Sequence, residues 1–369
     1  MDLPYWTHSD YFIFKPDFDS EIIDHIDIIK QYNKLVFSNY NDLESIIKYT
    51  NNENYDNDKY IGSEFDQPLS NSLDKLTNLI EITFGYSFNN PLVNSLDNLI
   101  NLTYIRFGWN FNVQLANSLD KLINLTCLIF GYQFNQPLAN SLDKLINLTY
   151  LTFGCEFNQL LSNSLDKLTY LEHLTFGWKF SQPLANSLNK LIKLTHITFG
   201  DYFNVQLADS LIQLINLTRI DFGSNFNQPL ANSLIKLINL THLIFSCDFN
   251  QSLTNVLYYL TKLEYLTLGY KFNQELNLPS NIKILNLNCN NKILIDSLPN
   301  SIEQLNLNYD FNLPLDNLPS SIKKIKFSKN SRYNCLLNNL SKSLEQLELP
   351  SKYNLEIKNK PPNCEIIYL

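Results

Sequence analysis

Apolar residues recur along this chain with a fixed period. A phenylalanine recurs every 23 residues from Phe65 to Phe272, and the sequence around it is nearly the same in each copy. In the copy from Phe134 to Gly154 the spacing of the apolar positions changes from three to two: Leu142, Leu145, Leu148, Leu151 and Phe153. A step of three is typical of a 3₁₀ turn or short helix, and a step of two is typical of a strand.

Each copy is therefore expected to contain one turn and one strand. The segment from Asn140 to Leu145 begins with capping residues and should form an outer turn, Leu148 to Phe153 should form a strand, and Gly154 should let the chain bend away. A unit this short cannot enclose a core and must pack against its neighbours. The pattern predicts one elongated α/β solenoid: a curved parallel β-sheet with short helical or 3₁₀ turns on its outer side.

The period changes towards the end of the chain. After Leu268 the steps between equivalent strand positions fall from 23 to 19, 20, 20, 22 and 20 residues, and Pro279, Pro299 and Pro319 stiffen the shorter outer links. We predict 23-residue repeats over 61–271, shorter repeats over 272–349, and a capping strand within 350–369, formed by Cys364 to Leu369.

The repeated FNQPL blocks and the LPSSIKKIKF block carry a resemblance to known repeat proteins. With LxxLxF in place of LxxLxL, the chain resembles leucine-rich repeats, and more closely the FNIP-repeat proteins of social amoebae and giant DNA viruses. This likeness spans about residues 60 to 369 and implies a leucine-rich-repeat-like fold. The usual asparagine of a leucine-rich repeat is displaced by two places, so a differently built hydrogen-bond ladder is expected.

Residues 1–60 differ from the repeats and are predicted to form an N-terminal cap. An amphipathic helix is expected from Ser20 to Tyr32, with Ile22, Ile26 and Ile29 on one face, followed by a strand at Lys34 to Phe37 and a degenerate repeat at Tyr40 to Gly62. FNIP-type relatives often carry an F-box before the repeats, and Leu3-Pro4 is similar to the start of one. That resemblance would imply a Skp1-type partner and a role as substrate adaptor of a cullin ubiquitin ligase.

Asparagines recur at fixed places in the repeats. Those that follow the phenylalanine are predicted to satisfy backbone groups where each strand leaves the sheet, a structural role rather than a binding one: Asn89, Asn112, Asn135, Asn158, Asn204, Asn227, Asn250 and Asn273. The same reasoning covers the asparagines of the NS pairs: Asn117, Asn140, Asn163, Asn186 and Asn232. The NLT tripeptides resemble glycosylation acceptors but are expected to stay bare without a secretory signal.

Positions that vary between copies are the candidates for recognition. Equivalent strand residues of successive copies should form columns on the concave face, and Tyr, Trp, His and Arg are the residue types that dominate protein interfaces. The candidate binding residues are Tyr86, Tyr104, Arg106, Trp109, Tyr132, Tyr150, His173, Trp178, His196, Arg219, Asp221, His242, Tyr265 and Tyr270. The alternative is that Tyr and His are tolerated at half-exposed strand positions.

Other chemistries fit the sequence poorly. His173 and His196 should occupy adjacent rungs, with Cys127 or His242 further off, but a flat column spreads ligands that zinc requires to converge. Asp221 near His196 suggests an acid–base pair, yet no nucleophile motif or phosphate-binding glycine loop accompanies it. We therefore predict a protein that is not an enzyme, with no metal and no cofactor.

The net charge and the cysteine pattern limit the classes of partner and the cellular compartment that the sequence favours. The net charge of -8 leaves no basic excess for nucleic acid, and the six cysteines form no CxxC pair, as expected of reduced thiols. No signal peptide and no apolar stretch of membrane-spanning length is present in this sequence. We expect an intracellular protein, in the cytoplasm of a host cell, that binds an unidentified protein partner and neither nucleic acid nor membrane.

Overall fold

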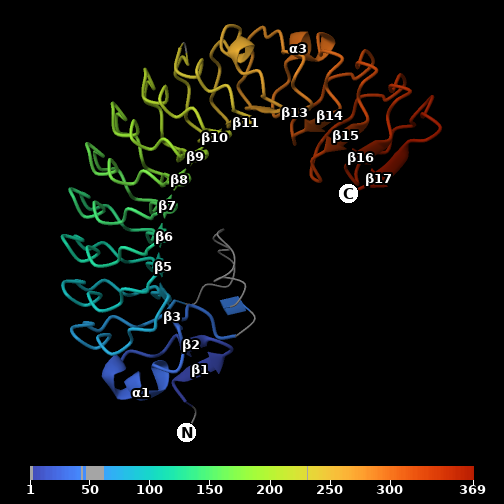
Figure 1. Cartoon of the computed structure of the whole chain (residues 1–369). Helices are drawn as coiled ribbons and strands as arrows, with labels where there is room; N and C mark the ends of the chain where they lie inside the picture. Colours follow the sequence, from blue (N-terminus) through green and yellow to red (C-terminus); the bar gives the residue numbers. More distant parts are fainter. Residues whose placement is uncertain (1–2, 43–44, 47–61, 231) are drawn as a thin grey trace. The chain divides into compact units, whose positions relative to one another are not determined.

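The computed structural model describes residues 3–42, 45–46, 62–230 and 232–369. Contacts divide the chain into two compact units, Met1–Leu194 and Thr195–Leu369, here called the N-terminal and C-terminal units. In each unit the strands stack side by side on one side and the turns lie on the other (Figure 1). The predicted degenerate repeat from Tyr40 to Gly62 falls largely outside the described residues.

Among its described residues, the N-terminal unit contains the following strands and short helical segments. Its elements are β1 Tyr5–His8, β2 Tyr11–Phe14, the 3₁₀ helix η1 Ile22–His25, α1 Ile26–Ile29, β3 Lys34–Phe37, β4 Glu81–Thr83, β5 Tyr104–Arg106, β6 Cys127–Ile129, β7 Tyr150–Thr152 and β8 His173–Thr175. β1 pairs with β2 in antiparallel fashion, and every later neighbour from β2 to β8 pairs in parallel.

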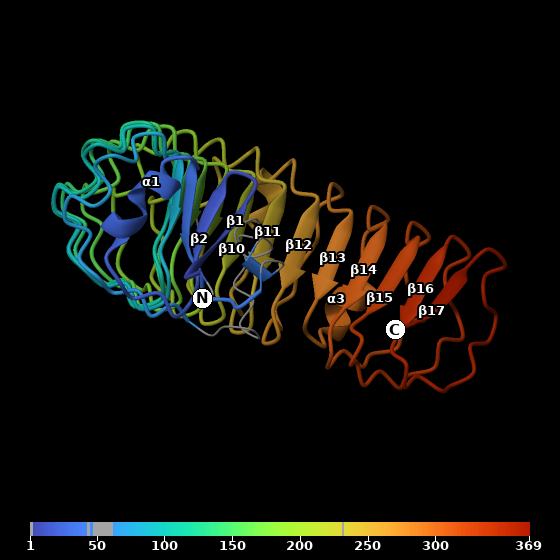
Figure 2. The same cartoon turned by 90° about the horizontal axis from the view of Figure 1, so that it is seen from below.

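The C-terminal unit repeats the parallel arrangement, and its strands are seen side by side in Figure 2. Its elements are β9 His196–Thr198, β10 Arg219–Phe222, β11 His242–Phe245, the 3₁₀ helix η3 Leu257–Tyr259, β12 Tyr265–Leu268, β13 Ile284–Leu287, α3 Lys292–Asp296, β14 Gln304–Leu307, β15 Lys324–Phe327, β16 Gln346–Leu349 and β17 Glu365–Tyr368. Each strand pairs in parallel with the next. The predicted parallel solenoid is confirmed.

Two predicted elements are shorter in the structure. The strand expected from Leu148 begins only at Tyr150, because the Leu148 N–H still bonds the Leu145 carbonyl of the preceding turn. The helix expected over Ser20 to Tyr32 is η1 followed by α1, which end at Ile29. Its β-branched isoleucines are poor helix formers, and Glu21 gives no side-chain cap. Its buried face is nevertheless the predicted one, and the strand predicted at Lys34 to Phe37 is confirmed as β3.

Two columns of phenylalanine fill the core of the 23-residue repeats, and leucine takes most of the equivalent strand positions from Leu268 onward. In the N-terminal unit the rings of Phe107 and Phe130 stack 5.8 Å apart along one column, and those of Phe111 and Phe134 stack 6.1 Å apart along the other. The columns touch each other, with 3.9 Å between the ring centroids of Phe107 and Phe111. Leucines of the turns close this core and are fully buried, so almost all the apolar area of a repeat is shared with its neighbours.

Glycines at the strand ends allow the repeats to approach. A Cβ on Gly131 would lie 1.6 Å from the carbonyl oxygen of Gly108, and one on Gly154 would lie 1.7 Å from that of Gly131. Gly154 has no positive φ, so its role is not the conformational freedom that the sequence suggested. It is required because any side chain would collide with the preceding repeat.

An asparagine ladder connects the turns that follow the strands. The Oδ1 of Asn112 accepts the backbone N–H of Asn135 at 2.9 Å and the side-chain amide of Gln136 at 3.1 Å, and Asn135 repeats both bonds one copy later, to Asn158 and Gln159. The predicted structural role of these asparagines is confirmed.

A second ladder was not anticipated. The asparagines of the NLT tripeptides donate their side-chain amides to a carbonyl of the previous copy, as Asn147 does to Ile123 at 2.8 Å. Their conserved spacing within the chain is thus explained by backbone satisfaction.

We predict that Gly131→Ala lowers the free energy of unfolding by about 3 kcal/mol or more, because the new methyl group overlaps a backbone carbonyl that cannot move alone. Urea denaturation followed by circular dichroism measures the loss. Gln133→Ala, an exposed change in the same turn, is the control and should have little effect. A Gly131→Ala protein with an unchanged urea midpoint would contradict the close approach.

Asn135→Ala should lower the free energy of unfolding by about 1 to 3 kcal/mol, since it leaves the Asn158 N–H without its acceptor. Asn135→Asp is the matched control, because Asp66 fills the equivalent place and accepts the Asn89 N–H at 2.8 Å. Thermal unfolding compares the two variants. Equal destabilisation by alanine and aspartate would show that the acceptor oxygen is not what matters.

Candidate binding face on the strand side

The first residues of the strands form a column in the N-terminal unit. The parallel register places Glu81 beside Tyr104, Tyr104 beside Cys127, Cys127 beside Tyr150, and Tyr150 beside His173. All five are half-buried, and the rings of Tyr150 and His173 lie 5.6 Å apart. The structure therefore brings together this set of predicted residues, as period and register require.

Arg106 departs from the prediction. It was expected to be exposed, but only 3% of it is accessible, and its Nε donates to the Tyr104 hydroxyl at 2.9 Å. Burial raises the pKa of Tyr104 despite the neighbouring guanidinium. Arg106 and Tyr104 thus form a fixed pair within the sheet rather than a free contact surface.

Charged residues surround this pair. Lys34 Nζ lies 3.6 Å from Glu81 Oε2 and 3.5 Å from Asp10 Oδ2. Burial raises the pKa of Glu81, although Lys34 and Arg106 act in the opposite direction. Burial alone would lower the pKa of Lys34, but the Tyr11 hydroxyl and the two carboxylates outweigh it and raise that pKa. Within this cluster the positive charges of Lys34 and Arg106 are balanced by the negative charges of Glu81 and Asp10.

Aromatic rings line the strand-end rim just after the glycines. The rings of Tyr86 and Trp109 stack with centroids 5.8 Å apart, and those of Trp109 and Tyr132 stack 4.0 Å apart and almost parallel. All three are half-buried, and Trp178, two copies after Tyr132, is 49% exposed. This row is held rigid by its own stacking and still presents aromatic surface to solvent.

The corresponding face of the C-terminal unit is more polar. Arg219 Nε donates to Asp221 Oδ2 at 2.9 Å, and the rings of His242 and Tyr265 stack 5.0 Å apart. Burial lowers the pKa of His242, and the Arg219 charge acts in the same direction. His196 is half-buried on β9, and its Nδ1 lies 2.8 Å from the Thr195 hydroxyl. Tyr270, on the rim after β12, is exposed.

An amide network in the shorter repeats was missed by the sequence analysis. Gln304 Nε2 donates to Asn306 Oδ1 at 2.9 Å, and Asn306 Nδ2 donates to Asn286 Oδ1 at 2.5 Å. Asn286 in turn donates to Thr267 Oγ1 at 2.9 Å and to the hydroxyl of Tyr265. All of these residues except Tyr265 border a shallow groove of about 410 Å³. The signal was present in ILNLN and QLNLN, where the same strand position is Asn in both copies.

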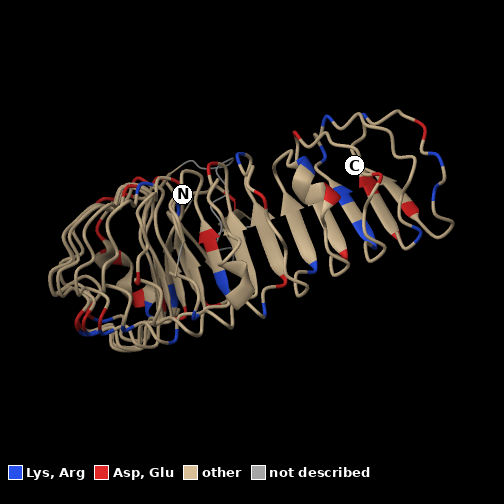
Figure 3. Ribbon diagram, turned by 90° about the horizontal axis from the view of Figure 1, so that it is seen from above, with Lys and Arg blue, Asp and Glu red and all other residues tan. Residues whose placement is uncertain are grey.

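A buried carboxylate follows this network. Glu348 on β16 is 6% exposed, and its oxygens lie 2.8 Å from Lys324 Nζ and 3.1 Å from Lys326 Nζ. Burial alone would raise the pKa of Glu348, but the hydrogen bonds and charges of the two lysines outweigh it and lower that pKa. In Figure 3 blue and red ribbon segments lie on neighbouring strands near the C-terminus.

The comparisons with known proteins agree with this geometry. The FNIP repeat model matches residues 272–310 and 290–330. The crystal structure of CroV588, described as a novel circular LRR protein from a giant virus, superimposes with a TM-score of 0.76 at 29% identity, over 99% of this chain and 50% of that chain. This chain therefore spans about half the length of that protein. Residues 272–330 thus match the FNIP repeat, and the fold of the chain is that of a leucine-rich-repeat-like solenoid.

More distant structures share the leucine-rich-repeat solenoid. An internalin, InlF from Listeria monocytogenes, superimposes with a TM-score of 0.61 at 16% identity, over 86% of this chain and 87% of that chain. TLR13, in a complex with ssRNA13, gives a TM-score of 0.64 at 16% identity, over 94% of this chain and 52% of that chain. A search of curated proteins found no match. Such solenoids are typical of protein–protein interaction scaffolds.

Metal-ligating residues do not converge in the part of the chain that the structure describes. No group of three or more His, Cys, Asp or Glu residues that could hold a metal ion occurs within residues 3–42, 45–46, 62–230 and 232–369. His173 and His196, the pair considered from sequence, fall in different units. Across the same residues, no helix has both the length and the apolar character needed to cross a bilayer.

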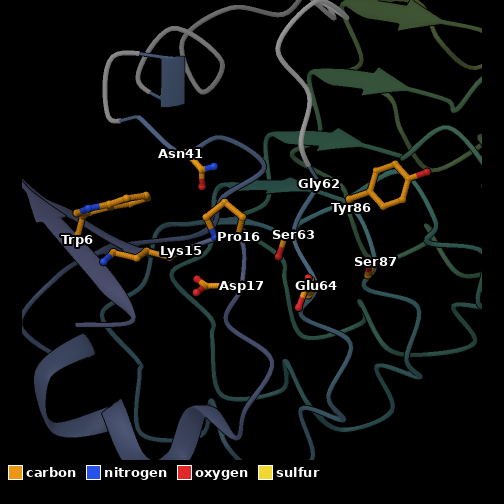
Figure 4. Close-up of a pocket in the computed structure, with 10 residues that line it drawn as sticks. All are labelled: Trp6, Lys15, Pro16, Asp17, Asn41, Gly62, Ser63, Glu64, Tyr86 and Ser87. Atoms are coloured by element: carbon orange, nitrogen blue, oxygen red, sulfur yellow. The ribbon is translucent and has the colours of Figure 1, made fainter. Parts of the chain in front are cut away.

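A hollow of about 710 Å³ lies at the strand ends of the N-terminal unit. Figure 4 shows Trp6 beside Lys15, whose ammonium is 5.3 Å from the indole ring, with Asp17 and Glu64 opposite and Tyr86 at the far side. One cation and two carboxylates line it, so its charges favour no single class of ligand.

Glu348 predicts a specific acid sensitivity. Its pKa in the folded protein is lowered from the ordinary 4.5, so its stabilising contribution is complete above 4.5 and is lost as the pH falls through the folded value. Glu348→Gln should lower the free energy of unfolding at pH 7 by about 1 to 3 kcal/mol and should flatten its decline below pH 4.5. Urea denaturation between pH 3 and pH 7 measures both effects.

Glu303→Gln provides the matched control, because Glu303 forms an exposed pair with Lys323 at 3.0 Å. A solvent-exposed ion pair contributes little to stability, so this variant should keep the acid profile of the native chain. If both variants behaved alike, burial of the Glu348 pair would not be the cause.

Proposed function

We propose that this leucine-rich-repeat protein is a non-catalytic scaffold that binds a protein partner through the strand side of the solenoid. The supporting observation is the rigid row of Tyr86, Trp109 and Tyr132, together with the exposed Trp178. Stacked aromatic side chains lose little conformational entropy on binding and give a large contact area. They lie where successive repeats present equivalent positions, which suits an extended partner surface.

The other candidate residues divide by their environment. Tyr150, His173, His242 and Tyr265 are half-buried and offer one ring edge to a partner, and Arg219 with Asp221 offers a polar pair. Tyr104 and Arg106 support the face from within. We assign the recognition to the aromatic rim and treat the inner pair as scaffold, with residues 1–60 and 350–369 as the proposed caps of the repeats.

Alanine substitution tests the rim. Trp109→Ala and Trp178→Ala should each weaken partner binding about tenfold or more, because truncating a buried interface aromatic commonly costs about 2 kcal/mol. Affinity purification of the full chain from its host, with mass spectrometry, supplies the partner, and calorimetry with the purified partner gives the dissociation constants.

Tyr258→Ala is the matched control, since Tyr258 is 77% exposed in η3, away from the strand-end rim. It should leave the affinity unchanged. Equal affinities for the native protein and both tryptophan variants would exclude the rim as the binding site.

An F-box-like adaptor remains the second candidate, on the family resemblance of Leu3-Pro4. In the structure β1, β2 and β3 of this segment pair with the sheet and leave Leu3 exposed. Pull-down of a purified Skp1-type subunit by the full chain distinguishes the candidates: retention at micromolar concentration would favour the adaptor.

A further inference from the structure

Three cations meet at the strand-end rim of the C-terminal unit. Lys329 lies two residues after β15, Arg332 lies three residues later, and Lys352 lies three residues after β16. They line one hollow of about 630 Å³ together with Tyr309 and Tyr333. Of the three, Lys329 holds the repeat position that bears the aromatic row of the N-terminal unit, two residues after a buried strand-end side chain, and Arg332 and Lys352 lie further along the same loops.

The charge of this hollow is uncompensated. No carboxylate lines it, and none of the three cations has an ion-pair partner within 4.0 Å among the residues that the structure describes. The lysines of the neighbouring strand face differ, because Lys324 and Lys326 share Glu348 and Lys323 pairs with Glu303. In a chain of net charge -8, such a local excess of positive charge is a property of the site rather than of the surface as a whole.

Backbone and ring contacts fix the wall of the hollow. The Arg332 N–H bonds the Tyr309 carbonyl at 3.2 Å, and its guanidinium lies 4.9 Å from the Tyr309 ring centroid. The Tyr333 ring stacks on Tyr353 with centroids 5.9 Å apart, and the Tyr353 hydroxyl donates to the Cys335 carbonyl at 3.1 Å. The arginine is thereby held in place before any ligand arrives, which reduces the entropic cost of binding.

A buried donor in this wall lacks a partner. The Tyr333 hydroxyl forms no hydrogen bond among the described residues, although Tyr333 is 97% buried by its 3% exposure. An unsatisfied buried polar group is uncommon in folded proteins and costs free energy. The hydroxyl oxygen is itself inaccessible to solvent and the ring stacks between Phe311 and Tyr353, so Tyr333 supports the wall from the core and its hydroxyl is not a ligand contact.

We propose that this hollow binds a phosphate monoester, carried by a phosphorylated side chain of the protein partner. A monoester has a charge of about -1.5 to -2 at pH 7 and three acceptor oxygens, which suit two ammonium groups and one guanidinium fork. A phosphodiester has a single charge, and a nucleic-acid strand needs a continuous basic track. The paired lysines of the adjacent face provide no such track. That a protein partner carries the phosphate rests on the proposed function, whereas the phosphate site itself does not depend on it.

The three arginines of the chain supply a direct readout: Arg106, Arg219 and Arg332. Nitrogen-15 spectra of their Nε–H groups should show the Arg332 signal shifting when a peptide acetyl-Gly-Gly-phosphoserine-Gly-Gly-amide is added to the full chain. The Arg106 and Arg219 signals are internal controls and should stay in place. The unphosphorylated peptide should produce no shift.

Charge-neutral variants test the lining. Lys329→Gln and Lys352→Gln should each raise the dissociation constant of the phosphopeptide about tenfold, as expected for the loss of one charge-assisted hydrogen bond. Lys323→Gln removes the same charge from an exposed, paired lysine of the same unit and should have no effect. All three variants leave the core intact, and their unchanged urea midpoints would establish this.

Several outcomes would overturn the proposal. An unshifted Arg332 signal, or equal affinity in the Lys329→Gln and Lys323→Gln proteins, would show that the hollow is not a phosphate site. Binding of inorganic phosphate without binding of the phosphopeptide would assign it to a free ion. Tighter binding of a short single-stranded RNA would assign it to nucleic acid. None of these results depends on the tryptophan variants, so this inference can fail while the aromatic rim still binds a partner.

Discussion

The close approach of successive repeats is the constraint on which the structure depends. Glycines at the strand ends let one backbone lie against the carbonyl of the copy before it, at a distance that no side chain would permit. The phenylalanine columns then stack at 5.5 to 6.1 Å in the N-terminal unit, with nearly parallel rings. The 23-residue period therefore determines the distance between repeats, the stacking of the core rings and the pairing of the strands.

This constraint separates scaffold from recognition. Positions that satisfy backbone groups or fill the core must be the same in each copy, as the asparagine ladders and the buried leucines are. The residues left free to vary are those at the start of each strand and on the rim. There the N-terminal unit presents stacked aromatic rings and the C-terminal unit presents cations and amides. One frame thus offers two chemically different surfaces.

The architecture was largely predictable from sequence because the burial pattern is periodic and local. The parallel strands, the buried face of the N-terminal helical segment and the backbone role of the Asn112 type of asparagine followed from spacing and residue type. The burial of individual side chains could not be predicted from spacing and residue type. Arg106 occupies a position that is half-exposed in later copies, yet it is buried, because burial depends on the neighbouring segments and not on its place in the repeat.

The cationic hollow was missed for a related reason. Lys329, Arg332 and Lys352 are scattered in sequence and lie where the period is irregular, so no motif connects them. The amide network was accessible in principle, since Asn286 and Asn306 share one strand position. Similarity between copies marks a structural role in the asparagine ladder, but in the amide network it also produces a continuous polar surface.

The hydrogen bonds of the asparagine ladder reach only from one copy to the next, as from Asn112 to Asn135. In such an array each repeat is stabilised mainly by contacts with the repeats directly before and after it. Damage to one rung should therefore divide the stack into segments that melt independently, and the surviving segments should keep their amide protons protected from exchange.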